Sequence, residues 1–178
     1  MSTRAVAAAA VAAIAALAGA PAAFADSSQS SNWAGYAIHR SGLRFTKVIC
    51  TWTQPSATCS GGEPAYSSVW VGIGGYSTSS QALEQIGTEA DCSAAGAAVS
   101  SAWYELVPQA SRTIALTIDP GDRVRASVSV AGHEVSLTLD DLTRHRSFIR
   151  RLRASVTDTT SAEWIVEAPL VCTGAGES

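Results

Sequence analysis

The feature that most constrains the fold of this chain is a series of short segments in which apolar and polar residues alternate. The segments SSVWVGIGG, SAWYELVP and SAEWIVEAP have the two-residue period of a β-strand. Clusters of turn-forming residues, such as CSGGEP, DPGD and AGH, separate these segments at intervals of about eight to twelve residues. No segment after residue 25 shows a convincing helical pattern. We therefore predict an all-β domain, built as an antiparallel sandwich or barrel.

The predicted strands are short stretches rich in β-branched and aromatic residues. In chain order they are SNWAGYAI (31–38), FTKVICTWT (45–53), YSSVWVGIGG (66–75), QALEQIGTE (81–89), SAWYELVP (101–108), TIALTI (113–118), RVRASVSV (123–130), EVSLTLDDL (134–142), SFIRRLRASV (147–156) and AEWIVEAP (162–169). The turns DPGD and AGH predict that TIALTI, RVRASVSV and EVSLTLDDL form one meander. There is no internal repeat and no domain boundary, so residues 26–178 are expected to form one domain.

The first 25 residues have the features of a secretory signal peptide. Arg4 is followed by the apolar run AVAAAAVAAIAALAGA, and AFA precedes Asp26 as a small-x-small cleavage signal. The alternative is an uncleaved membrane anchor, but the run is short and dominated by alanine. The sequence therefore predicts a secreted protein without stable membrane association after cleavage.

Charge and cysteine content narrow the classes of function. Without Arg4, residues 26–178 hold 11 basic and 15 acidic residues, a net charge of −4, which argues against a general nucleic-acid binder. The four cysteines of an exported chain indicate disulfides, but spacing alone does not choose among the three possible pairings. There is no CxxC pair and no HExxH motif, so no metal site and no cofactor are predicted.

Several residues that could carry chemistry have a structural explanation as well. The three histidines could belong to a Ser-His-Asp triad, yet no GxSxG elbow is present. The glycines of GIGGY fit tight backbone curvature better than a nucleotide-binding loop. The five arginines of RHRSFIRRLR fit a solvated strand face, with Phe148 and Leu152 turned inward, better than a polyanion-binding patch.

Carboxyl groups on apolar strand faces are the stronger candidates. Strand periodicity places Glu163, Ile165 and Glu167 on one face, and Glu105 on the same face as Trp103. A carboxyl group among apolar groups in a concave site has a raised pKa, which suits acid–base chemistry. Taken singly, a carboxylate of this kind is more often a surface or structural residue.

Six stretches, taken in order, carry a resemblance to a known family. SNWAGY, SSVWVGIGG, ALEQIGTE, AWYELVP, PGD and SAEWIVEAP resemble the signature series of the glutamic peptidases, the eqolisins or G1 family. The resemblance covers roughly residues 31–170. It implies a lectin-like β-sandwich of two antiparallel sheets, with a substrate cleft on the concave sheet, and endopeptidase activity at acidic pH without a metal.

The resemblance also implies roles for individual residues. Gln85 matches the catalytic glutamine of the family, and Glu167, rather than Glu163, matches the catalytic glutamate. Glu167 would take a proton from the attacking water and return it to the leaving amine, while the Gln85 amide would hold the water and donate to the oxyanion. The residues expected to line the cleft or to orient this pair are Trp33, Trp70, Glu89, Trp103 and Glu105.

Further expectations concern partners, disulfides and departures from the family. Protein or peptide substrates are expected for a monomeric enzyme, and a bridge between Cys59 and Cys92 would tie the strand before Trp70 to the segment after Gln85. Gly74 stands where many members have aspartate, which removes one acidic partner. Only eleven residues follow Glu167, so we expect the sandwich to lack the family's last strands, together with a partner for Cys172.

Two other functions remain open at this point. A non-catalytic sandwich could bind peptide or carbohydrate, with Trp33, Trp70 and Trp103 as a stacking platform. A glycosidase would need two carboxyl groups about 5 to 10 Å apart. Glu163 and Glu167 are too far apart for this, at roughly 13 Å along one strand, but Glu105 with Glu167 would fit.

Overall fold

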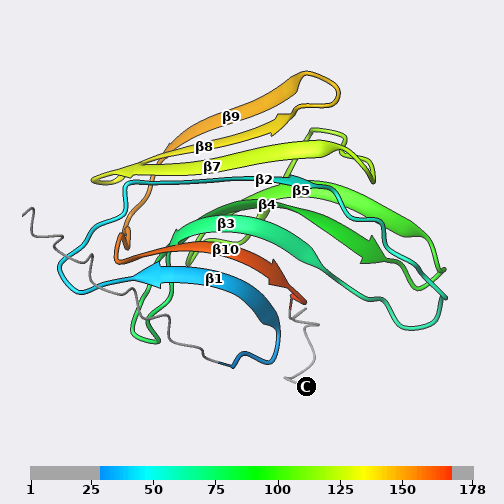
Figure 1. The fold of residues 1–178 in the computed structure, drawn as a ribbon, viewed down its shortest axis with the longest axis horizontal. Coiled ribbons are helices and arrows are strands. Elements are labelled where there is room, and N and C mark those ends of the chain that lie inside the picture. Colours follow the sequence, from blue (N-terminus) through cyan, green and yellow to red (C-terminus); the bar gives the residue numbers. More distant parts are fainter. Residues whose placement is uncertain (1–28, 170–178) are drawn as a thin grey trace, which may run out of the picture.

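The computed structural model describes residues 29–169 as two stacked antiparallel β-sheets (Figure 1). The predicted signal peptide and Cys172 lie outside the described residues. Within residues 29–169 no helix is present, so none there is long and apolar enough to cross a membrane. The structure confirms the predicted β-sandwich.

The larger sheet has six strands. Their order across the sheet is β1 (Trp33–His39), β10 (Ser161–Glu167), β3 (Ser68–Gly74), β4 (Leu83–Cys92), β5 (Ala98–Leu106) and β6 (Arg112–Ile114). Its strands are bowed, with the hollow side turned away from the other sheet (Figure 1).

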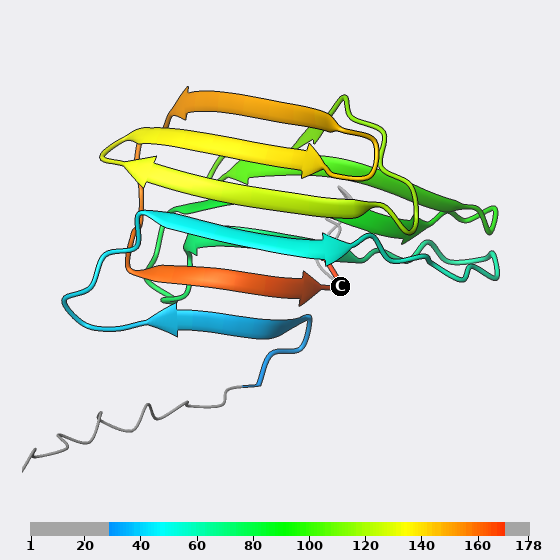
Figure 2. The ribbon, with the colours of Figure 1, turned by 45° about the horizontal axis from the view of Figure 1, so that its top comes forward.

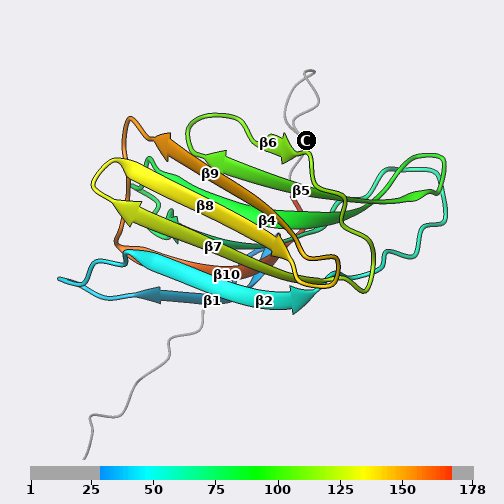
Figure 3. The same ribbon diagram turned by 90° about the horizontal axis from the view of Figure 1, so that it is seen from above.

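The smaller sheet has four strands and covers only part of the larger one. Their order is β2 (Lys47–Thr53), β7 (Arg123–Ala131), β8 (Glu134–Asp141) and β9 (Arg146–Arg153). Figure 2 shows β1, in blue, as the outermost strand of the larger sheet on the side of β2. Seen from above, the strands of the two sheets run in similar directions, as in an aligned sandwich (Figure 3).

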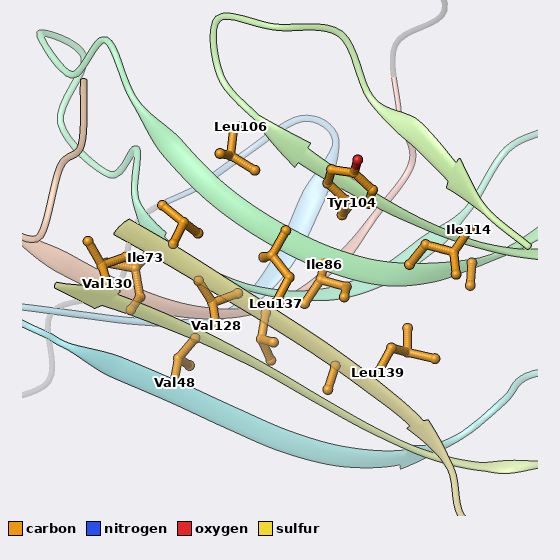
Figure 4. Close-up of a cluster of buried hydrophobic side chains, with 14 of the residues drawn as sticks. Val48, Ile73, Ile86, Tyr104, Leu106, Ile114, Val128, Val130, Leu137 and Leu139 are labelled. Atoms are coloured by element: carbon orange, nitrogen blue, oxygen red, sulfur yellow. The ribbon is translucent and has the colours of Figure 1, made fainter. Parts of the chain in front are cut away.

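The core lies between the sheets and follows the alternation seen in the sequence. Every second residue of β7 and β8 is buried, and these side chains meet Ile73, Ile86 and Tyr104 of the larger sheet (Figure 4). Phe148 and Leu152 pack against this core, as expected for the inner face of the arginine-rich strand. The remaining face of the larger sheet is therefore the one that holds Gln85 and Glu167.

One predicted connection is wrong. TIALTI was expected to form a hairpin with RVRASVSV, but only Arg112–Ile114 is a strand, and it pairs with β5 in the larger sheet. Strand β7 belongs to the smaller sheet, so residues 115–122 cross from one sheet to the other. The alternation of apolar residues is the same on both sides of a sandwich, so it could not show this change of sheet. The β7–β8–β9 meander does form.

The structure forms the expected disulfide. Cys59 and Cys92 are bonded, with a Cα–Cα distance of 5.4 Å. The bridge ties the loop before β3 to the end of β4, next to an isolated pairing of Ala65 with Cys92. Cys50 has no disulfide partner among residues 29–169.

Candidate active site

The outer face of the larger sheet presents its side chains in rows that cross the strands. Strand registers define three of these rows. The Glu167 row holds Trp33, Glu167, Ser68, Glu89 and Ser101; the Trp70 row holds Gly35, Ile165, Trp70, Gly87 and Trp103; the Gln85 row holds Ala37, Glu163, Gly72, Gln85 and Glu105. All the predicted site residues therefore lie on one face, within three neighbouring rows.

Two N–H donors hold the Glu167 carboxylate. The Trp70 indole Nε1 donates to Oε2 at 2.8 Å, and the Asn32 amide Nδ2 donates to Oε1 at 3.0 Å. Both bonds leave lone pairs of the half-buried carboxylate available on the open face. Asn32 was not among the predicted site residues. The signal for it was its place beside Trp33, which pairs with Glu167 across β1 and β10.

Gln85 is held by a carboxyl group on the next strand. Its Nε2 donates to Glu105 Oε2 at 2.6 Å, and the two residues are direct partners between β4 and β5. Only 7% of Gln85 is exposed, and its Oε1 has no hydrogen-bond partner among the described residues. The Glu105 carboxyl group thus holds one side of the Gln85 amide.

Trp70 lies between the Gln85 row and the Glu167 row. A Cβ built on Gly72 would meet Trp70 Cζ3 at 3.1 Å, and one built on Gly87 would meet Trp70 Cβ at 2.6 Å. The indole therefore lies over positions without side chains, with its N–H directed at Glu167. Trp70 also packs with Trp103, Ile165 and the half-buried Trp33.

The carboxyl groups on this face influence one another. Burial raises the pKa of Glu105, and the charge of Glu167 raises it further. The hydrogen bond that Gln85 donates to Glu105 acts in the opposite direction. Burial likewise raises the pKa of Glu89, against a hydrogen bond from Ser101 and with help from the charge of Asp91. The site therefore holds carboxyl groups that keep their protons to higher pH than usual, close to the charge of Glu167.

Two further buried carboxyl groups, Glu163 and Glu84, lie near Gln85. Burial and the nearby charge of Asp158 raise the pKa of Glu163 to about 7, although Ser161 donates to it at 3.1 Å. Glu84 points into the core, where burial and Asp158 raise its pKa to about 8. Glu163 shares the face and row of Gln85 but forms its hydrogen bond with its own strand.

Position 74, where the family often has aspartate, is occupied differently here. Gly74 has φ +85°, and a Cβ built on it would meet the Asp158 carbonyl at 2.6 Å. The Asp158 carboxylate accepts hydrogen bonds from Ser80, Thr160 and the Gly75 amide; although burial opposes the shift, these bonds lower its pKa. The segment around Asp158 thus fills the space a side chain at 74 would need.

Other candidate sites receive less support. His39 stacks on Tyr76, and His133 lies 3.2 Å from the carbonyl of Ala154; among residues 29–169 neither forms a hydrogen bond with a serine or an aspartate side chain. Within residues 29–169 no group of His, Cys, Asp and Glu could hold a metal ion. A surface hollow between residues 77–82 and 156–160 lies beyond the end of the site and not over Glu167.

Comparisons with known proteins show the family of this chain. The family model described as the Peptidase A4 family matches residues 31–176. Scytalidopepsin B from Scytalidium lignicola is 34% identical over 148 residues, which is 80% of this chain and 53% of that protein. The chain therefore spans about half the length of this curated relative.

Solved structures show the same fold. Scytalido-glutamic peptidase with a transition state analog inhibitor has a TM-score of 0.68 and 30% identity, over 82% of this chain and 68% of that one. SCP-B, described as a member of the eqolisin family of peptidases and bound to the tripeptide Ala-Ile-His, has a TM-score of 0.60 and 30% identity, over 76% and 63%. The chain belongs to the Peptidase A4 family, the glutamic peptidases also called eqolisins.

Proposed function

We propose that this protein is a secreted acid endopeptidase in which Glu167 and Gln85 form the catalytic pair. The observation that carries the proposal is the arrangement on the open face of the larger sheet. Trp70 and Asn32 donate hydrogen bonds to Glu167, and the Gln85 amide donates one to Glu105. The charge of Glu167 also contributes to the raised pKa of Glu105. The predicted signal peptide supports secretion.

The proposed mechanism uses one carboxylate and one amide. Glu167 in its ionised form takes a proton from a water molecule as that water attacks the scissile carbonyl, and then gives the proton to the leaving amine. The Gln85 amide holds the water and donates to the developing oxyanion. No metal is required, and a single catalytic carboxylate differs from the two aspartates that pepstatin-sensitive peptidases use.

Glu105 would decide which atom of the amide faces the substrate. An ionised Glu105 accepts a hydrogen bond, so it holds Nε2 of Gln85, and Oε1 stays without a partner. A protonated Glu105 can donate to Oε1 and so leave Nε2 free to serve the oxyanion. Because burial raises the pKa of Glu105, the second arrangement dominates in acid, which supports activity in the acidic range.

The proposal is tested with the purified chain and a denatured protein substrate. We expect hydrolysis near pH 3 to 4, insensitive to pepstatin and to chelators, as the carboxylate chemistry requires. Gln85→Ala and Glu167→Gln are expected to abolish it. Glu134→Gln is the matched control, because Glu134 is an exposed carboxylate of the smaller sheet paired with Arg153. Wild-type activity in either site variant would refute the assignment.

The structure bears on the two rival functions. Trp70 and Trp103 are only 6% and 8% exposed, so a stacking platform for carbohydrate would rest on Trp33 alone. A glycosidase using Glu105 and Glu167 would need Glu105 free, whereas it is bonded to Gln85. Binding of peptide or glycan without hydrolysis would favour the binding module.

A further inference from the structure

The Ser68 hydroxyl is a buried polar group with no assigned partner. Ser68 is 2% exposed, and its Oγ has no hydrogen bond within the part of the chain that the structure describes. Buried hydroxyl groups in folded proteins nearly always form a hydrogen bond, and each exception asks for an explanation. No role was predicted for Ser68 from the sequence.

The position of Ser68 suggests what its partners are. In the Glu167 row, Ser68 pairs with Glu167 on β10 and with Glu89 on β4. All three side chains lie on the open face, and directly opposite residues have Cβ atoms about 4.5 to 5.5 Å apart. The hydroxyl therefore stands between two carboxyl groups, within reach of either after a rotation about its Cα–Cβ bond.

Both carboxyl groups already accept hydrogen bonds from other donors. Glu167 accepts from Trp70 and Asn32, and Glu89 accepts from the Ser101 hydroxyl. A serine hydroxyl can donate one hydrogen bond while accepting another. Ser68 is thus the one group in this row able to connect the two carboxyl groups.

We propose that Ser68 is a positioning residue that links Glu89 to the catalytic Glu167. In acid, a protonated Glu89 donates to the Ser68 oxygen, and the Ser68 hydroxyl donates to the Glu167 carboxylate as a third donor. When Glu89 ionises, it competes for the same hydroxyl proton, and Glu167 loses that donor. The state of Glu89 thereby controls how well the charged form of Glu167 is stabilised.

The surroundings favour this arrangement at low pH. The charged groups around the row are acidic: the charge of Asp91 acts on Glu89, the charge of Glu167 acts on Glu105, and Glu163 lies two residues from Ile165 on the same face. Burial raises the pKa of Glu89, so Glu89 is protonated over more of the acidic range than a solvated glutamate would be.

This inference rests on the proposed peptidase function, and its first test uses activity. The acid limb of the kcat/KM profile reports the ionisation of the catalytic base. For Ser68→Ala we expect this limb to move up by about 0.5 to 1 pH unit, the effect of removing one donor to the charged form. KM should change little, because the variant alters the ionisation of the base and not the binding of substrate. Ser127→Ala is the control, since Ser127 is a half-buried strand serine of the smaller sheet.

A second variant separates linkage from mere packing. Glu89→Gln keeps an N–H donor toward Ser68 at every pH, so the acid limb of the kcat/KM profile should stay near its wild-type position. In the Ser68→Ala, Glu89→Gln double variant, the acid limb should lie where it lies in Ser68→Ala. Equal, additive shifts in both single variants would show that the two residues act independently and would overturn the proposal.

A readout without activity makes the two proposals distinguishable. Carboxyl carbon NMR titration of Glu167 in the Gln85→Ala background should show the same upward shift when Ser68 is replaced by alanine. This shift, found together with a wild-type chain that hydrolyses no peptide, would support the Ser68 link and remove the proposed function. If the wild type hydrolyses peptides but Ser68→Ala moves neither the pH profile of kcat/KM nor the NMR titration of Glu167, the proposed function stands and the Ser68 link is refuted.

Discussion

The bond from Trp70 Nε1 to Glu167 Oε2 is the contact that most directly orients the proposed base. Trp70→Phe keeps a ring over Gly72 and Gly87 but removes this donor. A hydrogen bond to a charged group contributes about 1.5 to 3 kcal/mol, so kcat/KM should fall on the order of 10- to 100-fold. The measurement is kcat/KM on a peptide substrate at acidic pH.

Trp103→Phe is the comparison for that experiment. Trp103 packs in the same cluster, but its Nε1 has no partner among the described residues. Its replacement reports the loss of ring volume without the loss of a hydrogen bond to Glu167. Equal losses in both variants would show that packing, and not the bond to Glu167, explains the effect of Trp70.

Glu84 predicts a pH dependence of stability. It is 0% exposed, both carboxyl oxygens lack partners among the described residues, and burial raises its pKa from 4.5 to about 8. Because the folded state holds this proton more tightly than the unfolded state, the free energy of unfolding should decrease as pH rises from 4.5 to about 8. The decrease attributable to Glu84 is at most about 4 to 5 kcal/mol.

Urea unfolding between pH 4 and about pH 8 measures this slope. Glu84→Gln should flatten it, because an amide in the same place does not titrate, and it should stabilise the protein most at the alkaline end. A slope identical to that of the wild type would assign the effect to other groups, of which the buried Glu163 is the first candidate, with a pKa of about 7.

At the scale of elements, the approach of β3 to β4 depends on glycine. A Cβ on Gly87 would lie 2.3 Å from the Val69 carbonyl and 2.6 Å from Trp70 Cβ. Neither neighbour can move without displacing the strand, so Gly87→Ala should destabilise the protein by about 1 to 3 kcal/mol and disturb the Trp70–Glu167 bond. The midpoint temperature of thermal unfolding and kcat/KM should both decrease.

Gly72→Ala is the matched variant on the neighbouring strand. Its added Cβ would meet side-chain atoms and not backbone, with Leu83 Cδ1 at 2.9 Å and Trp70 Cζ3 at 3.1 Å, and the Leu83 methyl group can rotate away. A smaller loss of stability than for Gly87→Ala is therefore expected. The opposite order would show that the side chains over Gly72 are more tightly held than the backbone beside Gly87.

At the scale of the whole molecule, the Cys59–Cys92 bridge closes a loop with a sequence separation of 33. Chain-entropy arguments give about 3 to 4 kcal/mol for a loop of this length. The Cys59→Ala, Cys92→Ala double variant should lose this much in chemical unfolding, while Cys50→Ser tests a cysteine without a partner among residues 29–169. An unchanged midpoint in the double variant would show that the bridge does not limit stability.

The sequence by itself determined the fold class and the faces. The two-residue alternation fixed which side of each strand enters the core, because a register shift of one residue would expose the whole apolar set. It placed Glu167 with Ile165, and Glu105 with Trp103, on one face of their own strands, and the six-part resemblance attached roles to these carboxyl groups and to Gln85. The alternation could not show that residues 115–122 cross between sheets, since both sheets bury the same pattern.

Only the tertiary structure decided which groups touch. The bonds that orient Glu167 join residues 135 and 97 positions apart, from Asn32 and from Trp70. Such contacts depend on strand order and register, which local sequence does not encode. The same holds for Ser68 between two carboxyl groups and for Asp158 beside Gly74: each residue looks ordinary in the sequence, and its environment comes from strands or loops distant along the chain.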